Sequence, residues 1–91
     1  LPSAELLAQT HEFPGCYMFK AIGRSEGGFV ARIVAAIREE LECDVDPPYR
    51  VRETAGGRHV SVTIEPVVES AWDVLAIYQL LGQIDGVMFV C

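Results

Sequence analysis

The alternation of polar and apolar residues is clearest in residues 58–65 (RHVSVTIE), where Val60, Val62 and Ile64 alternate strictly with polar residues. A period of two places the aliphatic side chains on one face of a β-strand and the polar side chains on the other. β-Branched residues favour such a half-buried surface. This stretch therefore predicts a strand that the rest of the chain pairs with or covers.

The residues before this strand predict a strand, a helix and a second strand. Residues 16–22 alternate but are largely apolar on both faces, which is typical of a central strand. In residues 29–41 the apolar spacing changes to three and four, which predicts an amphipathic helix. The prolines at 47–48 cannot continue that helix. Residues 49–54 then form a short strand, and the glycine-rich turn at 55–57 joins it to the next one as a hairpin.

The residues after the central stretch predict one more helix and one more strand. Pro66 lacks a backbone N–H, so the strand is expected to end or bulge near it. Ser70 and Asp73 resemble a capping box at the start of a helix, and an apolar stripe then continues to Gly82. Residues 87–91 form the last strand.

This order of elements predicts an α+β fold, the ferredoxin-like βαββαβ sandwich. Right-handed crossovers place the strands at 16–22 and 58–65 in the centre of a four-stranded antiparallel sheet. They also place both helices on one face of that sheet. Residues 1–12 carry few apolar positions and are expected to form an N-terminal arm, with residues 13–91 as a single domain.

The amino-acid composition favours a protein with its own hydrophobic core and disfavours a nucleic-acid-binding or membrane-spanning protein. With 91 residues, of which 51% are hydrophobic, the chain can bury a core without a metal or a disulfide framework. Its 7 basic and 13 acidic residues give a net charge of −6, which disfavours nucleic acid and anionic membranes as partners. Cys16, Cys43 and Cys91 lack paired spacing and predict reduced thiols in a cytoplasmic protein. No apolar run is long enough to span a bilayer.

Two helices cover only one face of such a sheet, so the opposite face is the first candidate for function. It is expected either to be solvated, with an ion pair between Lys20 and Glu65, or to bind a second copy or a protein partner. Trp72 at the start of the second helix is either a lid on the core or an exposed anchor for that partner. The residues expected to form the partner surface are Met18, Lys20, Ile22, Arg50, Arg52, Trp72, Met88 and Val90.

Residues 13–23 (FPGCYMFKAIG) resemble the opening signature of the YbeD-like family of small bacterial domains of unknown function. The resemblance continues through residues 57–64 and 69–70, and then through residues 77–78, Leu81 and residues 87–90. That family is similar in fold to the ACT regulatory domains, which sense small molecules and pair through sheets and helices, and a link to the regulation of lipoate metabolism has been suggested for it. The resemblance implies a regulatory homodimer without assigned catalytic residues. The chain departs from the family pattern at Gly27, Gly28, Pro66, Trp72, Leu75 and Leu80.

A second resemblance implies an enzyme. Residues 23–29 (GRSEGGF) look like the phosphate loop of acylphosphatases, and residues 51–58 look like the segment that bears their water-orienting Asn. Here Ala31 occupies the position of the phosphate-binding Arg, Arg32 lies about 100° further around the helix, and Glu53 occupies the Asn position. A carboxylate repels a bound dianion. The loop is therefore either a simple turn or a small-molecule site formed by Gly23, Arg24, Ser25, Gly27 and Gly28.

Other chemistry is sparse in the sequence. His11 and His59 have no second ligand at metal spacing, and Cys16 at a strand start is expected to be a packing residue. No nucleophile and base can be paired. We therefore expect a non-catalytic regulatory or protein-binding module without cofactor or metal, possessing a homodimer or protein-partner surface on the open sheet face. The alternatives are an ACT-like small-molecule sensor and a degenerate acylphosphatase-like hydrolase.

Overall fold

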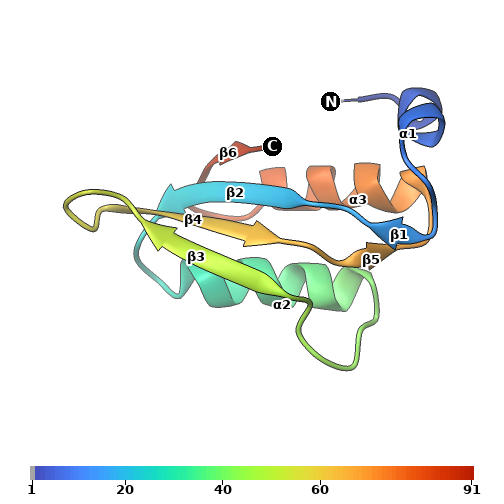
Figure 1. Ribbon diagram of the computed structural model, residues 1–91. Helices are drawn as coiled ribbons and strands as arrows, with labels where there is room; N and C mark the ends of the chain where they lie inside the picture. The colour runs from blue at the N-terminus through green and yellow to red at the C-terminus, as the bar shows by residue number, and fades with distance from the viewer. Residues whose placement is uncertain (1) are drawn as a thin grey trace.

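A computed structural model describes residues 2–91 and shows an α+β fold with antiparallel sheets (Figure 1). The elements within these residues are, in chain order, α1 (Ala4–Thr10), β1 (Gly15–Cys16), β2 (Phe19–Arg24), α2 (Phe29–Glu40), β3 (Tyr49–Glu53), β4 (His59–Ile64), β5 (Val67–Val68), α3 (Ala71–Gly82) and β6 (Val87–Val90).

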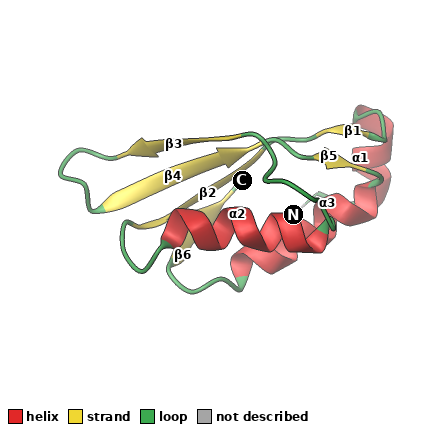
Figure 2. Ribbon diagram, turned by 90° about the horizontal axis from the view of Figure 1, so that it is seen from below, coloured by secondary structure: helices red, strands yellow, loops and turns green. Residues whose placement is uncertain are grey.

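The main sheet has four strands in the order β3-β4-β2-β6, and each neighbouring pair is antiparallel. The predicted central positions of β2 and β4 are confirmed. Helices α2 and α3 pack side by side on one face of this sheet (Figure 2). The two long helices also begin where the sequence predicts, at Phe29 and directly after Ser70.

Strands β1 and β5 form a second, two-stranded sheet that continues the register of the first. Cys16 lies opposite Val67 in the same register in which Phe19 lies opposite Ile64. Pro66 lies between β4 and β5 and has no N–H to donate, although its carbonyl accepts a hydrogen bond from the amide of Tyr17 at 3.0 Å. The predicted interruption at Pro66 is confirmed, and it divides the strand expected at 16–22 into β1 and β2.

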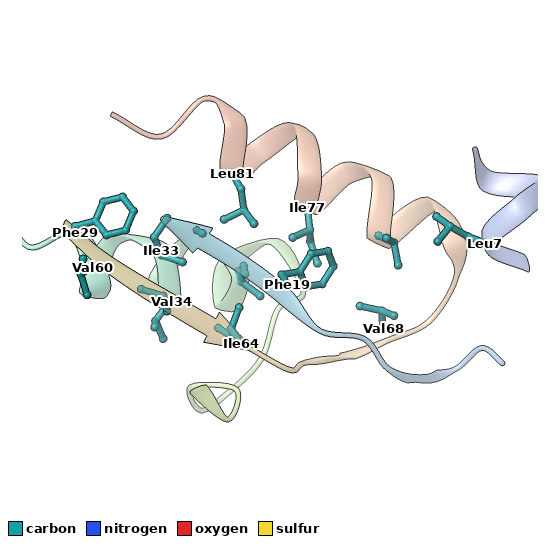
Figure 3. Packing of buried hydrophobic residues seen from close by; sticks show 14 of the residues in the cluster. Leu7, Phe19, Phe29, Ile33, Val34, Val60, Ile64, Val68, Ile77 and Leu81 are labelled. Atoms are coloured by element: carbon teal, nitrogen blue, oxygen red, sulfur yellow. The ribbon is translucent and has the colours of Figure 1, made fainter. Parts of the chain in front are cut away.

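The core lies between the main sheet and the two helices (Figure 3). The face of β4 that carries Val60, Val62 and Ile64 is fully enclosed, as its alternation predicts. Each such aliphatic side chain contributes about 1.5–3 kcal/mol relative to an exposed position. The other buried apolar residues are Leu7, Phe19, Ala21, Phe29, Ile33, Val34, Ile37, Val68, Ala71, Val74, Ile77 and Leu81.

The N-terminal segment is attached to this core more firmly than the sequence suggests. Ser3 caps α1 by accepting a hydrogen bond from the amide of Leu6 at 3.1 Å. One turn of that helix packs against α3, and Leu7 is only 2% exposed. The expectation that residues 1–12 bury little is therefore wrong for Leu7, because α3 supplies an apolar surface for a single side chain.

The predicted capping box at α3 forms only in part. Asp73 accepts a hydrogen bond from the amide of Glu69 at 3.0 Å, while the side chain of Ser70 makes no capping bond. The carboxylate thus satisfies an amide one residue before the cap rather than the amide of the cap itself.

Candidate functional site

The sheet face opposite the helices presents a row of side chains whose character changes from strand to strand. Arg52, Ser61, Ile22 and Phe89 lie opposite one another on β3, β4, β2 and β6. The row thus passes from a cation through a hydroxyl to an aliphatic and an aromatic side chain. Phe89 is 66% exposed, so the apolar end of the row lies open to solvent.

A second row runs parallel to the first. Arg50, Thr63 and Lys20 lie opposite one another on β3, β4 and β2. Cys91 continues the row, because it exchanges two backbone hydrogen bonds with Lys20, at 2.7 and 2.8 Å. Thr63 is only 9% exposed. The cations and hydroxyls of both rows line a groove of about 380 Å³ formed by Lys20, Arg50, Val51, Arg52, Ser61 and Thr63.

This groove has the chemistry of an anion site. Lys20, Arg50 and Arg52 are three of the seven basic residues in a chain with an acid excess. Guanidinium and ammonium groups form strong, charge-assisted hydrogen bonds to carboxylates and phosphates. The hydroxyl groups of Ser61 and Thr63 can donate further bonds to the same oxygens. The groove can therefore hold a carboxylate or phosphate group.

The ion pair on this face differs from the expected one. Glu65 approaches Arg50 at 3.5 Å, and the expected pair of Glu65 with Lys20 does not form. The amide of Glu65 bonds to the carbonyl of Pro48 at 3.0 Å, which holds Glu65 beside the start of β3. Arg50 is largely exposed and Glu65 is about half exposed, so their pair contributes little to stability.

The expected position of Val90 is wrong because β6 contains a bulge. The ladder between β2 and β6 shifts by one residue at Met88, which is exposed. One extra residue reverses which side chains face the core. Val90 consequently lies opposite Ala21 and packs against the core, whereas Phe89 lies opposite Ile22 on the open face. No periodicity in the sequence marks this bulge, so sequence reasoning missed Phe89.

Two other predicted members of the partner surface lie apart from these rows. Met18 is exposed between β1 and β2, and its neighbours Tyr17 and Phe19 pack toward the core, which is consistent with its expected place on the open side. Trp72 is 71% exposed at the start of α3, in the helix layer. It therefore neither covers the core nor joins the surface of the open sheet face.

The loop at residues 23–28 is held by hydrogen bonds within itself and to neighbouring segments of the chain. The amide of Ser25 donates to the carbonyl of Arg58, and the amide of Glu26 donates to the carbonyl of Arg24, both at 2.9 Å. The side chains of Arg24 and Glu26 also form an exposed ion pair at 4.0 Å. These two amides are thus occupied and do not point toward a ligand.

Gly23 has a packing role in this loop. It is a buried residue of β2, and a Cβ atom there would lie 2.4 Å from Cε1 of Phe29 and 2.5 Å from the carbonyl oxygen of Gly86. Gly27 and Gly28 adopt left-handed φ values of 63° and 68°, which glycine tolerates best. Gly28 is the N-cap of α2.

Arg32 ties this loop to the segment before β6. Its Nε donates to the carbonyl of Gly27 at 3.0 Å, and its Nη1 donates to the carbonyl of Asp85 at 2.6 Å. Its guanidinium also lies 5.8 Å from the ring centroid of Phe29. Sequence reasoning recognised only that Arg32 points away from a phosphate, and it missed this structural role, which depends on residues 53 positions apart.

A groove beside the loop brings some of the predicted ligand residues together. It has a volume of about 450 Å³ and runs between the start of α2 and the β3–β4 pair. Arg24 and Gly27 instead line a separate hollow with Arg32. The groove is lined by Ser25, Glu26, Gly28, Phe29, Val30, Ala31, Tyr49 and Val60.

The histidines and cysteines are the remaining candidates from the sequence. Within residues 2–91, no three His, Cys, Asp or Glu side chains lie close enough to hold a metal ion. All three cysteines are free thiols, and Cys16 is exposed, so its expected packing role is wrong. The ring of His11 lies 5.0 Å from the ring of Tyr17.

Tyr78 has a displaced pKa. Burial raises the pKa of its phenol well above the ordinary value of 10.0, and a hydrogen bond with the hydroxyl of Tyr17 at 3.2 Å raises it further. The phenol therefore stays neutral at physiological pH. It belongs to an aromatic cluster with Tyr17 and Phe19 at the edge of the core.

None of the helices in residues 2–91 has the length and apolar character that crossing a bilayer requires. These observations define a small α+β domain whose main sheet, within the described residues, is covered by helices on one face. Residues 8–91 match the family described as "Protein of unknown function (DUF493)", and the chain belongs to that family. The YbeD-like resemblance is thereby confirmed.

Two curated relatives agree with this membership. One is a UPF0250 protein of Shewanella oneidensis, 32% identical over 76 residues, which cover 84% of each chain. The other is a UPF0250 protein of Shewanella woodyi, 30% identical over the same length and with the same coverage.

Proposed function

We propose that this chain is a non-catalytic regulatory module that binds a protein partner through the open face of a ferredoxin-like sheet. The observation that carries the proposal is that one sheet face presents both the exposed aromatic ring of Phe89 and the cations Lys20, Arg50 and Arg52. Exposed apolar surface rimmed by polar groups is characteristic of interaction sites. Aromatic residues and arginine are also the residue types most enriched there.

The fold supports this proposal in two ways. The strand order β3-β4-β2-β6, with α2 and α3 on one face, favours a ferredoxin-like sandwich, to which α1 and the β1–β5 pair would be additions. Such a sandwich leaves one sheet face without a helical layer. The chain can therefore present four strands to a partner without rearranging its core.

The positive charge of the open sheet face favours an acidic partner protein over a second copy of this chain. Two copies stacked face to face must keep Lys20, Arg50 and Arg52 away from the same residues of the other copy. A homodimer would therefore have to centre on Ile22 and Phe89. A partner protein that carries carboxylates can instead use both the apolar and the cationic parts of the face.

The test compares two exposed apolar residues. Phe89→Ser removes the aromatic ring from the face, and Val45→Ser removes a side chain that is 74% exposed in the loop between α2 and β3. Partner proteins should become cross-linked in the host cell to the wild-type chain and to Val45→Ser, but not to Phe89→Ser. The same set of cross-linked proteins for all three would contradict the proposal. Light scattering on the purified protein distinguishes a homodimer from binding to another protein. A monomeric mass at high concentration would exclude self-association.

A second candidate function is a small-molecule sensor, which the groove of about 450 Å³ beside the loop favours. Its lining joins the polar groups of Ser25 and Glu26 to the apolar surfaces of Phe29 and Val60. A thermal-shift screen with amino acids and nucleotides tests this candidate. It loses its support if millimolar ligand leaves the melting temperature of the protein unchanged.

The hydrolase alternative has less support. Arg32 is engaged by two backbone carbonyls, and the amides of Ser25 and Glu26 are bonded within the chain. A phosphate cradle needs such groups free and aimed at one point. This alternative would be excluded if benzoyl phosphate is hydrolysed no faster in the presence of the protein than in buffer alone.

A further inference from the structure

The free edge of β3 offers backbone groups for another strand. β3 pairs only with β4 and is therefore the margin of the main sheet within residues 2–91. The carbonyl of Pro48 and the amide of Thr54 both bond toward β4, at 3.0 Å each. Because bonding direction alternates along an antiparallel strand, the amides and carbonyls of Tyr49, Val51 and Glu53 point away from β4.

The two faces of this edge differ in chemistry. Tyr49 and Val51 lie on the helix side, yet they remain 46% and 45% exposed, because α2 packs against β4 and β2 instead. Figure 2 shows β3 at the margin of the sheet, away from both helices. The apolar groove lined by Phe29, Tyr49 and Val60 continues this side. On the opposite side, β3 presents Arg50 and Arg52.

The arginines disfavour the pairing of β3 with a second copy of itself. If two copies pair about Val51, Arg50 of one lies opposite Arg52 of the other. If they pair about Arg50 or about Arg52, that arginine lies opposite its own counterpart. These are the central antiparallel registers that align the outward backbone groups, and like charges directly opposite each other destabilise a sheet. Charged residues on an edge strand are a common protection against edge-to-edge association.

The same arginines favour an acidic strand. A strand added to this edge places every second side chain on the open face, opposite Arg50 and Arg52, and the others on the helix side, opposite Tyr49 and Val51. Carboxylates on the first set form charge-assisted bonds to the guanidinium groups. Arg50 already accommodates one carboxylate, that of Glu65 at 3.5 Å. Apolar side chains on the second set cover Tyr49, Val51 and the adjoining groove.

We propose that β3 binds an extended segment of a partner protein in which acidic and apolar residues alternate, adding a fifth strand to the main sheet. The inference rests on the proposed function as a protein-binding module and names the class of partner segment. Main-chain bonds to Tyr49, Val51 and Glu53 supply affinity, and the alternation of side chains supplies specificity.

The experiment uses a short peptide, blocked at both ends, in which Val and Glu alternate, and a matched peptide in which Val and Lys alternate. Addition of millimolar Val/Glu peptide should slow hydrogen exchange at the amides of Tyr49, Val51 and Glu53 in the full chain, measured by NMR. The Val/Lys peptide should not. Unchanged exchange at these three amides, or equal protection by both peptides, overturns the inference. Their protection in the protein alone at high concentration also overturns it, because a second copy then occupies the edge.

Two sets of variants sharpen the test. Val51→Pro removes an outward N–H without removing a bond to β4, and an edge strand tolerates this, so the Val/Glu peptide should no longer bind. Val51→Thr keeps the N–H and should bind. The double variant Arg50→Glu/Arg52→Glu should bind the Val/Glu peptide at least about tenfold more weakly than wild type does. It should instead bind the Val/Lys peptide. Retention of the Val/Glu peptide by Val51→Pro contradicts strand addition.

The two proposals fail separately. If cross-linked partners are lost by Phe89→Ser but kept by Val51→Pro, the open face binds them and the edge does not. If both variants keep every partner, the protein-binding function and the edge proposal both fail. Loss of the partners by Val51→Pro with a normal cooperative melt supports the edge.

Discussion

Replacement of Gly23 by alanine tests whether this glycine serves packing or a ligand. The new Cβ would lie 2.4 and 2.5 Å from Cε1 and Cζ of Phe29 and 2.5 Å from the carbonyl oxygen of Gly86. The ring has little room to move, because Phe29 is buried and Arg32 lies over it. The carbonyl is held as well, since it accepts a hydrogen bond from the amide of Arg24 at 3.3 Å.

Overpacking of this kind costs about 1–3 kcal/mol, and contact with a held backbone atom places Gly23→Ala near the upper end. With a urea dependence of about 1 kcal/mol per M, the midpoint of unfolding should fall by about 2–3 M. The matched control is Gly82→Ala in α3, where nothing lies within 4 Å of the added atom. It should leave stability unchanged or raise it by up to about 1 kcal/mol.

A double-mutant cycle identifies the clashing atoms. Phe29→Leu removes Cε1 and Cζ, so it should cost less in the Gly23→Ala background than in wild type. A Gly23→Ala midpoint equal to that of wild type would refute the packing role. The glycine would then be available for the ligand role expected from the sequence.

The remaining predictions concern stability: the N-cap of α2, the docking of α1, the hydrogen bonds of Arg32 and the ionisation of Tyr78. Gly28→Ala should lower the free energy of unfolding by about 1–2 kcal/mol because residue 28 has a φ of 68°, and Gly28→Asn should cost less, as urea titration would show. Leu7→Ala should cost about 2–5 kcal/mol, whereas Leu6→Ala, at an exposed neighbour, should change stability by less than about 0.5 kcal/mol; equal effects would mean that α1 does not dock. Arg32→Lys should cost about 1–3 kcal/mol in thermal or urea unfolding because one ammonium cannot replace the bonds to both carbonyls. The raised pKa of Tyr78 means that unfolded Tyr78 ionises above about pH 10 while the folded phenol stays neutral, so stability should fall as the pH rises through that range. Tyr78→Phe should show a shallower fall, and identical slopes would contradict the assignment.

Much of the architecture could be predicted because the spacing of apolar residues within short stretches of the chain indicates each strand and helix. The alternation around Val62 identified a central strand, and the three-and-four spacing after Phe29 identified a helix that begins at that residue. Pro66 predicted the interruption of the ladder because a missing N–H has the same effect in any fold. Each of these signals concerns residues close together in the chain.

The candidate site was predicted less completely. The cationic half, Lys20 with Arg50 and Arg52, follows from alternation within unbroken strands and lies where expected. In the apolar half Ile22 also lies where expected, but the extra residue at Met88 exchanges Phe89 for Val90 on the open face. Of the residues assigned to the loop at 23–28, Ser25 and Gly28 line one groove while Arg24 and Gly27 line a separate hollow, and the hydrogen bonds of Arg32 show that much of this loop is a structural connection.

The sequence by itself determined the order of the four main strands and the two long helices and which face of each regular strand is apolar, because backbone geometry imposes periods of two and 3.6 on any chain. Only the tertiary structure decided the partner of Glu65, the burial of Leu7, the contacts of Arg32 and the exposure of Phe89. These depend on which residues from distant parts of the chain meet, and on a bulge that no local pattern records. For that reason the α+β class and the positions of the main strands and the two long helices could be derived from the sequence, whereas these contacts and exposures could not.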